Sequence, residues 1–282
     1  MHDPFDPHRP LDEIAFALFD VETTGLSPAY GHRVCEVACL RLRDGVELDR
    51  FESFVDPERA ISAGAYHVNR ITPEMLAGAP AFETVAGTLL AMMEDAVLVA
   101  HNAPFDLGFL AKELSIARVP PPEGPVVDTL SLSRRIYTLP SHSLAAVATF
   151  LEAPSQPVHR AMSDVEATRH VLDRMFWDLD RRWGVTTLGQ LIDFQGGPIP
   201  YPYPRQLPLP PDIADALESR GRVYMRYVNA QGVESERVVR PIHIAERHGY
   251  LYLSAHCYQA GALRTFRLDR VVEMAVAEEA GD

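Results

Sequence analysis

The spacing of apolar residues divides the chain into two parts. The first part shows the spacings of both strands and helices, and the last part shows mainly that of strands. In the first part, short apolar runs typical of buried strands alternate with stretches that repeat apolar residues every three or four positions, as helices do. An Asp44-Gly45 turn joins two of the runs into a hairpin. The predicted strands are Ala15–Asp20, Arg33–Arg43, Glu47–Val55, Val97–Ala100 and Val126–Asp128. Strands that alternate with helices after an opening hairpin predict an α/β domain with a mixed sheet.

The helical segments lie between and after these strands. They are Phe82–Asp95, Pro104–Leu114, Thr129–Tyr137, Ser143–Glu152 and a long stretch within Val158–Asp180. In the long stretch, Ser163 and Glu166 have the spacing of a capping box, which predicts that the helix begins there. The segment Arg59–Ala79 shows neither periodicity, so we expect it to be irregular.

The second part of the chain begins with prolines and continues with strands. Seven prolines lie between Pro198 and Pro211, which predicts a semi-rigid linker over 184–211. A short helix and several short strands with regular turns follow, and they predict a small β-barrel or a compact β-domain. A length of 282 residues suits two domains, which we expect at 1–183 and 212–282.

Charge is distributed unevenly between these two parts. The net charge is −13, and residues 1–180 carry all of it, with 14 basic against 27 acidic side chains. Residues 219–272 are locally basic, with nine arginines against four acids. Arginine suits planar contacts with phosphates and bases, although the near absence of lysine could equally reflect genome composition.

The remaining composition indicates a cytoplasmic protein that does not interact with membranes. The three cysteines, Cys35, Cys39 and Cys257, lack metal-ligand spacing and are an odd number for a disulfide framework. The N-terminus has no apolar signal core, and no run of residues reaches membrane-spanning length.

The stretch FALFDVETTGLSP places two carboxylates side by side at the end of the first predicted strand. Residues two apart in a strand point to the same face, so Asp20 and Glu22 lie together. Like charges at such a separation repel unless a cation lies between them. An acidic loop at a strand end is the alternative interpretation of this stretch alone.

Two more carboxylates occupy the predicted first turns of helices, Asp106 and Asp164, and His159 precedes the second of them by five residues. Taken singly, Asp106 and Asp164 are explained by the helix dipole, which favours acids at a helix N-terminus. Taken together with the strand pair, they form an all-oxygen set that suits Mg²⁺ or Mn²⁺, with a histidine beside it that can act as a base.

At these three stretches the chain resembles the DEDDh family of 3′-to-5′ exonucleases, such as the proofreading subunit of bacterial DNA polymerase III. The matching motifs are FDVETTG, HNAPFD and HRAMSD, within Ala15–Asp180. The resemblance implies a ribonuclease H-like fold and two divalent metal ions, Mg²⁺ or Mn²⁺. It implies that the metal ligands are Asp20, Glu22, Asp106 and Asp164, and that His159 takes a proton from the attacking water.

The resemblance also implies contacts with the substrate. Backbone amides after Glu22 would bind the terminal 3′-OH, and Leu26 would wedge under the terminal base. The substrate-binding candidates that follow from the motifs are Thr23, Thr24, Leu26, His67, His101 and Asn102. We expect His101 and Asn102 to shape the second motif rather than to do chemistry, and we expect Asp128 to cap the following helix.

The end of the chain resembles the WYL domain, an SH3-like β-barrel that binds nucleic acid or nucleotides or regulates its neighbour. The matching segment is LYLSAHCYQAGALRTFRLDRV, in which Leu251 replaces the tryptophan of the family name. The first candidates for nucleic-acid contacts are Arg264, Arg267 and Arg270. In a regular strand, Arg264 and Arg267 would point to opposite faces. A packing domain with solvated arginines is the alternative.

Together these observations favour an enzyme. The leading hypothesis is a metal-dependent 3′-5′ exonuclease that acts on single-stranded or frayed DNA in DNA repair or nucleic-acid turnover. One alternative keeps the chemistry and makes the substrate RNA or short oligoribonucleotides, which differ by a 2′-OH that the sequence does not resolve. Another is a regulator that binds nucleic-acid ends without cleaving them. Any polymerase or repair-protein partner stays open.

Overall fold

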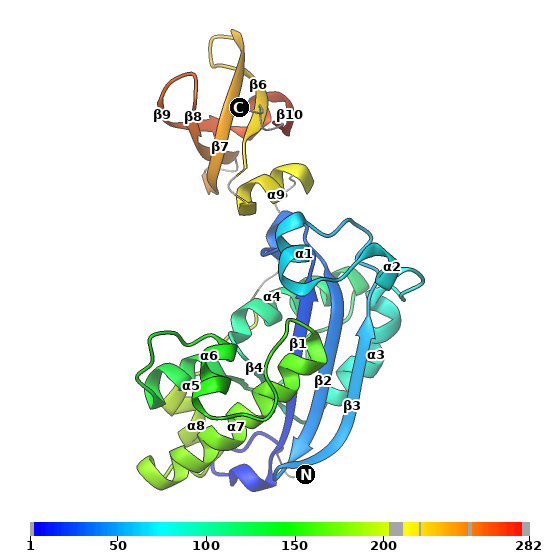
Figure 1. Ribbon diagram of the computed structural model, residues 1–282, viewed down its shortest axis with the longest axis vertical. Coiled ribbons are helices and arrows are strands. Elements are labelled where there is room, and N and C mark those ends of the chain that lie inside the picture. The colour runs from blue at the N-terminus through cyan, green and yellow to red at the C-terminus, as the bar shows by residue number, and fades with distance from the viewer. Residues whose placement is uncertain (1–2, 203–210, 220, 248–249, 278–282) are drawn as a thin grey trace. The chain divides into compact units, whose positions relative to one another are not determined.

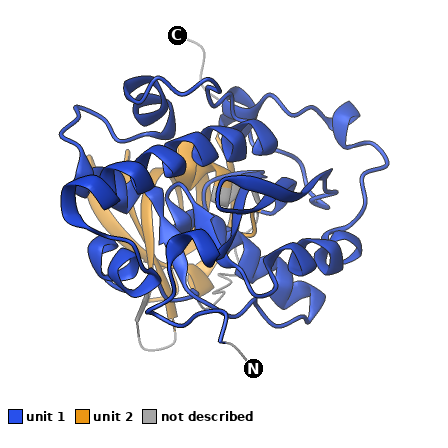
Figure 2. Ribbon diagram, turned by 90° about the horizontal axis from the view of Figure 1, so that it is seen from below, with its two compact units in different colours: residues 1–28, 33–205 blue, residues 29–32, 206–282 orange. Residues whose placement is uncertain are grey.

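The chain folds into two compact units. The computed structural model describes residues 3–202, 211–219, 221–247 and 250–277. One unit comprises residues 1–28 and 33–205, and the other comprises residues 29–32 and 206–282 (Figure 2). Prolines 204, 208 and 210 of the predicted linker lie outside the described residues. Among the described residues, no helix is both long enough and apolar enough to cross a membrane.

A five-stranded mixed sheet forms the centre of the first unit (Figure 1), which confirms the predicted α/β architecture with a ribonuclease H-like mixed sheet. Its strand order is β3-β2-β1-β4-β5; the first three strands are antiparallel, and β1, β4 and β5 are parallel. Asp44 and Gly45 both have positive φ in the β2–β3 turn, as the sequence predicted. The strands are β1 Ala15–Thr23, β2 Val34–Arg43, β3 Val46–Phe54, β4 Val97–Ala100 and β5 Val126–Asp128.

Helices cover both faces of this sheet (Figure 1). The helices in this part of the chain are α1 Ala63–Asn69, α2 Pro73–Leu76, α3 Phe82–Met93, α4 Ala103–Ala117, α5 Thr129–Ile136, α6 Leu144–Phe150, α7 Ala161–Trp183 and α8 Leu188–Gln195, with 3₁₀ turns at Leu11–Glu13 and Pro28–Tyr30. α5 to α8 pack on one face, and α3 and α4 pack on the other.

Three of the helices were not predicted. The segment expected to be irregular contains α1 and α2, whose first turns are capped by the side chains of Ser62 and Thr72. A cap residue followed by a short run is a weak signal because it fits an isolated turn as well. Helix α8 lies in the range expected to be linker, yet its Leu188 and Leu191 belong to the core of the first unit.

The alternation of side chains along β1 decides on which face of the sheet Asp20 lies. Phe16 and Leu18 pack under α7, whereas Ala17 and Phe19 pack against α3 and α4. Asp20 continues the first of these rows, so it lies on the α7 face near the end of the strand.

Helix α7 begins earlier than the capping box predicted. Its N-cap is Arg160, and the Ser163 hydroxyl donates to the Gln156 carbonyl at 3.2 Å instead of capping the helix. The start is stabilised from outside, because Glu36 of β2 accepts a hydrogen bond from the Ala161 N–H. A cap supplied by a distant strand leaves no local pattern in the sequence.

The second unit contains a five-stranded antiparallel sheet with the order β10-β6-β7-β8-β9. Its elements are α9 Pro211–Ser219, β6 Val223–Val228, β7 Glu234–Arg247, β8 Tyr250–Cys257, β9 Ala262–Arg267, a 3₁₀ turn Leu268–Arg270 and β10 Val271–Val276. In the described ladders β10 and β9 are edge strands, so these residues form an open sheet and do not show the predicted SH3-like barrel. Strand β7 continues past Pro241. Proline has no backbone N–H to donate, and a register shift between Pro241 and His243 accommodates it.

Asp128 at the end of β5 joins the starts of two helices. Its Oδ1 accepts hydrogen bonds from the N–H groups of Asn102, Ala103 and Leu130, and its Oδ2 accepts one from the Ser131 hydroxyl, at 2.7–3.3 Å. The side chain is buried. This confirms the prediction that Asp128 is a cap.

Replacing Asp128 with alanine should therefore destabilise the first unit. Asp128→Ala removes the acceptor of one buried and two partly buried N–H groups, and we expect a loss of about 2–4 kcal/mol in the free energy of unfolding. Urea unfolding followed by tryptophan fluorescence measures this unit, because both tryptophans of the chain, Trp177 and Trp183, lie in α7. Asp193→Ala, at an exposed position of α8, is the control. Equal midpoints for the two variants would contradict the capping role.

Candidate active site

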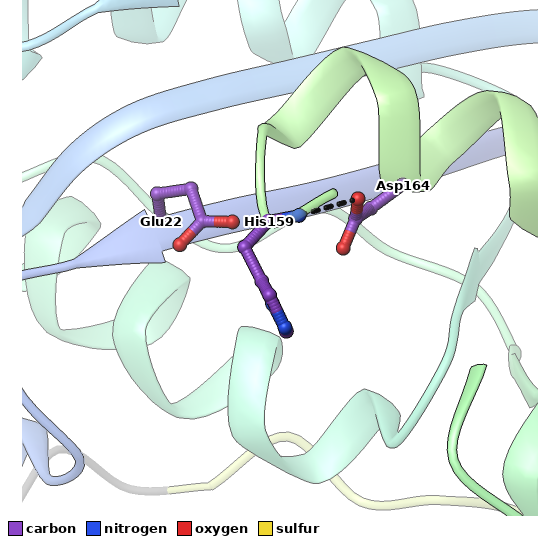
Figure 3. Close-up of side chains that lie close together, drawn as sticks. All are labelled: Glu22, His159 and Asp164. Atoms are coloured by element: carbon purple, nitrogen blue, oxygen red, sulfur yellow. Dashed lines mark hydrogen bonds between the residues drawn. The ribbon is translucent and has the colours of Figure 1, made fainter. Parts of the chain in front are cut away.

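The three acidic motifs converge on the α7 face near the end of β1. Ligand atoms of Glu22, His159 and Asp164 lie within 4.8 Å of one another (Figure 3). Asp20 interacts electrostatically with Asp106, Glu22 and Asp164, so the four carboxylates share one small volume. The structure therefore brings together the five residues that the motifs predicted.

Asp106 is fixed by the strand beside it. It lies in the first turn of α4 and is 3% exposed. Its Oδ1 accepts a hydrogen bond from the Val21 N–H at 3.2 Å, between the two β1 carboxylates in sequence. This bond ties the start of α4 to the strand that carries Asp20 and Glu22.

Asp164 organises the loop that carries His159. Its Oδ1 accepts hydrogen bonds from the N–H groups of Val158 and His159 at 3.0 and 3.2 Å. His159 has φ +58°, a left-handed conformation that is uncommon for a residue with a side chain. Its imidazole is exposed and extends from between the carboxylates of Glu22 and Asp164 (Figure 3).

The ionised forms of these carboxylates are unfavourable in the protein alone. Burial, followed by repulsion from Asp106 and Glu22, raises the pKa of Asp20 well above its ordinary value. Burial, followed by the charges of Asp164 and Glu36, raises the pKa of Glu22 from 4.5 to about 8. Burial also raises the pKa values of Asp106 and Asp164.

A divalent cation fits this donor set. The four side chains offer only oxygen atoms, and the repulsion among them is of the kind that a hard cation relieves. The ligands would be Asp20, Glu22, Asp106 and Asp164, as the motifs predicted.

The segment after β1 shows which predicted substrate contacts are accessible. Leu26 is 67% exposed, which suits a contact with a base. Thr24 is fully buried, and its N–H, one of the backbone amides after Glu22, donates to the Arg33 carbonyl at 2.9 Å. The Thr23 hydroxyl donates to the Gly25 carbonyl at 2.7 Å.

The other predicted substrate contacts of the first unit, His101, Asn102 and His67, differ in their surroundings. His101 contacts the Thr129 hydroxyl and the His142 carbonyl through its two ring nitrogens, both at 2.9 Å, and burial lowers its pKa. Asn102 is the N-cap of α4 with φ +70°. These geometries fit the interpretation that both residues shape the second motif. His67 is exposed on α1.

Two residues at the site were missed by sequence reasoning. Glu36 lies opposite Glu22 in the β1–β2 ladder, is 4% exposed and binds the guanidinium of Arg160. One acid inside the apolar run of β2 was the available signal, because a buried carboxylate requires a partner. The sequence did not show that this partner is the residue next to His159.

The arginines proposed for the second unit do not share one face. Strand β9 pairs with β8 in a continuous register, so Arg264 and Arg267 point to opposite sides. Arg264 is exposed, whereas Arg267 pairs with Asp269 at 2.7 Å and lies over the Tyr250 ring. Arg270 lies in the 3₁₀ turn that follows.

Comparison with known sequences gives two matches along the chain. The exonuclease family matches residues 18–172, and the WYL domain matches residues 209–276. DNA polymerase III PolC-type of Halalkalibacterium halodurans is 40% identical over 178 residues, which are 63% of this chain and 12% of that protein. The DNA polymerase III subunit epsilon-like protein of Rhodobacter capsulatus is 40% identical over 189 residues, which are 65% of this chain and 26% of that protein. The chain thus spans only a small part of the length of these relatives.

Solved structures share the fold. The nuclease domain of 3′hExo, a DEDDh family member bound to rAMP, superposes with a TM-score of 0.52 at 18% identity, over 60% of this chain and 95% of that one. E. coli Exonuclease I with a dA16 oligonucleotide gives 0.53 at 16% identity, over 86% of this chain and 55% of that one. The family match covers more than half of the chain and includes every residue of the acidic cluster and His159. The chain therefore belongs to the exonuclease family and carries a WYL domain after the exonuclease domain. The four carboxylates and His159 are the residues of the motifs by which it resembles the DEDDh branch.

Proposed function

We propose that the protein is a 3′-to-5′ exonuclease that uses Mg²⁺ or Mn²⁺ to hydrolyse single-stranded or frayed DNA ends. The observation that carries this proposal is the convergence of four carboxylates and an exposed histidine at the end of β1. The relatives support DNA as the substrate, because one is a DNA polymerase III of the PolC type and the other is named as similar to the epsilon subunit of DNA polymerase III. The proposed role is DNA repair or nucleic-acid turnover in the cytoplasm.

The chain's own groups suit phosphodiester hydrolysis. The exposed imidazole of His159 accepts the proton of the attacking water, because histidine is the side chain that most often serves as a general base. Asp164 holds the backbone of that histidine, and Leu26 contacts the terminal base. Bound divalent ions supply charge stabilisation and lower the pKa of water.

We assign substrate binding, not chemistry, to the WYL domain. The site residues lie before residue 165, in a part of the chain with net charge −13. The basic stretch 219–272 carries tyrosines among its arginines, a combination that suits sequence-tolerant contacts with a single strand.

A digestion assay tests the activity. The full-length protein with Mg²⁺ or Mn²⁺ should shorten a 5′-labelled DNA strand from its 3′ end, with a higher kcat/KM than on RNA of the same sequence. Asp20→Asn and Asp164→Asn should abolish cleavage because each removes a charged metal ligand. Asp193→Asn removes the same charge from an exposed position outside the site and should leave the rate unchanged.

Three outcomes would contradict the proposal in different ways. Cleavage in excess chelator, or by Asp20→Asn at the wild-type rate, would exclude the metal site. A preference for RNA would favour the oligoribonucleotide alternative. Binding of DNA ends without cleavage would favour a regulator.

The raised pKa values predict how stability depends on pH and metal. Folded Glu22 has a pKa of about 8 against an ordinary 4.5, so the folded state binds more protons than the unfolded state within that window. Stability of the metal-free protein should therefore fall as pH rises from about 6 to 8. Mg²⁺ should stabilise the protein more at pH 8 than at pH 6, because ionised carboxylates bind it.

Melting curves by tryptophan fluorescence, with chelator or Mg²⁺, measure both effects. Glu22→Gln removes this titrating group and should flatten the pH dependence of the metal-free protein, whereas Asp193→Asn should follow the wild type. The assignment of the carboxylate cluster fails if Glu22→Gln and wild type show the same slope and the same response to Mg²⁺.

The role of the WYL domain predicts a change in salt dependence. In an Asp164→Asn background, which prevents cleavage, Arg264→Ala should weaken binding to a long single strand and make its log–log salt slope shallower by about 0.7, the effect of one lost phosphate contact. Arg267→Ala should have a smaller effect because Asp269 already pairs with it. Arg118→Ala, an exposed arginine of the first unit, removes the same charge. Equal slopes for Arg264→Ala and Arg118→Ala would remove the nucleic-acid role of Arg264.

A further inference from the structure

We propose that the ion pair between Glu36 and Arg160 is a positioning device for His159, a role that rests on the proposed exonuclease activity. Arg160 follows His159 directly in the chain, and Glu36 lies on the strand next to β1. Neither residue belongs to the proposed metal ligands, and Arg160 acts through its neighbour.

Three N–H-bearing nitrogens donate to the Glu36 carboxylate, and we call this arrangement the clamp. Arg160 Nε donates to both carboxylate oxygens of Glu36 at 3.1–3.2 Å, and Nη2 donates to Oε1 at 2.7 Å. Oε2 also accepts the Ala161 N–H at 3.1 Å. One buried carboxylate thus holds both the side chain of Arg160 and the first residue of α7. A forked guanidinium suits this geometry, and an ammonium group does not.

The sheet supplies a fixed base for the clamp. Glu22, Glu36 and Phe54 occupy one row across β1, β2 and β3. The Arg160 guanidinium lies over the Phe54 ring, 5.2 Å from its centre. Arg160 is therefore held by the charge of Glu36 on β2 and by the ring of Phe54 on β3. Because β2 pairs with β1, these contacts fix the position of Arg160 relative to the strand that carries Glu22.

The segment 158–161 is held from both sides of His159. On one side, Asp164 accepts the N–H groups of Val158 and His159. On the other side, Glu36 holds Arg160 and Ala161. Between these anchors His159 keeps φ +58°, a conformation that costs free energy for a residue with a Cβ and persists where the surroundings impose it. The two anchors together impose it.

A purely stabilising role does not explain where Glu36 lies. Its charge is directly opposite Glu22 and adds to the repulsion in an acidic cluster. An apolar residue at this position would avoid that repulsion, and buried ion pairs are often no more stabilising than apolar side chains of similar size. What the pair provides is a defined path for the backbone into the loop that carries the imidazole.

A double-mutant cycle on kcat tests this role. His159→Ala should lower kcat by about 10²–10⁴-fold, the usual effect of losing a general base. Arg160→Gln and Glu36→Gln should each lower kcat by about 10–100-fold at unchanged KM, as loss of a supporting partner does. In the His159→Ala background, the same substitutions should change kcat by less than about twofold, because the group that they position is absent. Arg160→Lys should fall between wild type and Arg160→Gln.

A matched ion pair elsewhere in the first unit provides the control. Glu113 accepts two hydrogen bonds from Arg33 at 2.8 Å and one from the Val34 N–H at 3.0 Å, and it is 1% exposed. Glu113→Gln therefore breaks a similar clamp. Any loss of kcat that it causes should be the same in both backgrounds.

Hydrogen exchange gives a readout without catalysis or metal. In the metal-free protein, amides of residues 158–161 should exchange faster in Arg160→Gln than in wild type and should be unchanged in Glu113→Gln. This would show that the clamp orders the His159 segment in particular.

Each contrary result identifies what has failed. If His159→Ala keeps the wild-type kcat, the proposed base is wrong and the clamp has no group to position. If His159→Ala is slow but Arg160→Gln lowers kcat by the same factor in both backgrounds, the positioning role is wrong although the exonuclease proposal stands. If Arg160→Gln shifts the half-saturating Mn²⁺ concentration but keeps the wild-type kcat at saturation, the positioning role is wrong, and the clamp instead holds Asp164 in place for metal binding.

Discussion

Repulsion among four carboxylates that share one small volume is the constraint on which the first unit depends. Asp20 and Glu22 point to the same face because strand residues alternate, and the starts of α4 and α7 add two more acids to that face. Burial raises the free energy of every charged form, so the rest of the fold must hold the cluster together against its own charge. Packing supplies that force: one row of β1 residues anchors α7, and the other row anchors α3 and α4.

Hydrogen bonds then convert this packing into a defined geometry. Asp106 accepts an N–H from β1, and Asp164 accepts two N–H groups from the loop before its own helix. In all three of these hydrogen bonds the acceptor is the Oδ1 atom of the aspartate. The bonds orient the side chains independently of any metal, so the donor set is preorganised before an ion binds.

Sequence reasoning found what is encoded locally and missed what is encoded by tertiary contact. The strand alternation at Asp20 and Glu22, the glycine turn after Asp44 and the helix start before Asp106 all have local causes, and the structure confirms them. The start of α7 was misplaced because its external partner, Glu36, lies on another strand. The hydrogen bond from the Thr24 N–H to the Arg33 carbonyl is likewise a contact between residues nine apart that the motif around Glu22 does not reveal. The predicted barrel came from the resemblance to the WYL domain and from turn spacing. Turn spacing sets strand lengths but does not determine whether the edges of a sheet close.

The division of charge along the chain follows from the chemistry that we propose. A site that holds two divalent ions must be acidic, and an acidic surface repels the polyanion that the site hydrolyses. Bound ions neutralise the cluster locally but leave the remaining acids of residues 1–180, which outnumber the basic residues there. A single-strand end needs few contacts at the site, so attraction for the rest of the strand can come from a separate basic module. Within the first unit, an unpaired arginine next to the carboxylates would compete with the metal. Arg160 follows His159 directly in the sequence, and Glu36 pairs with it through two of its nitrogens.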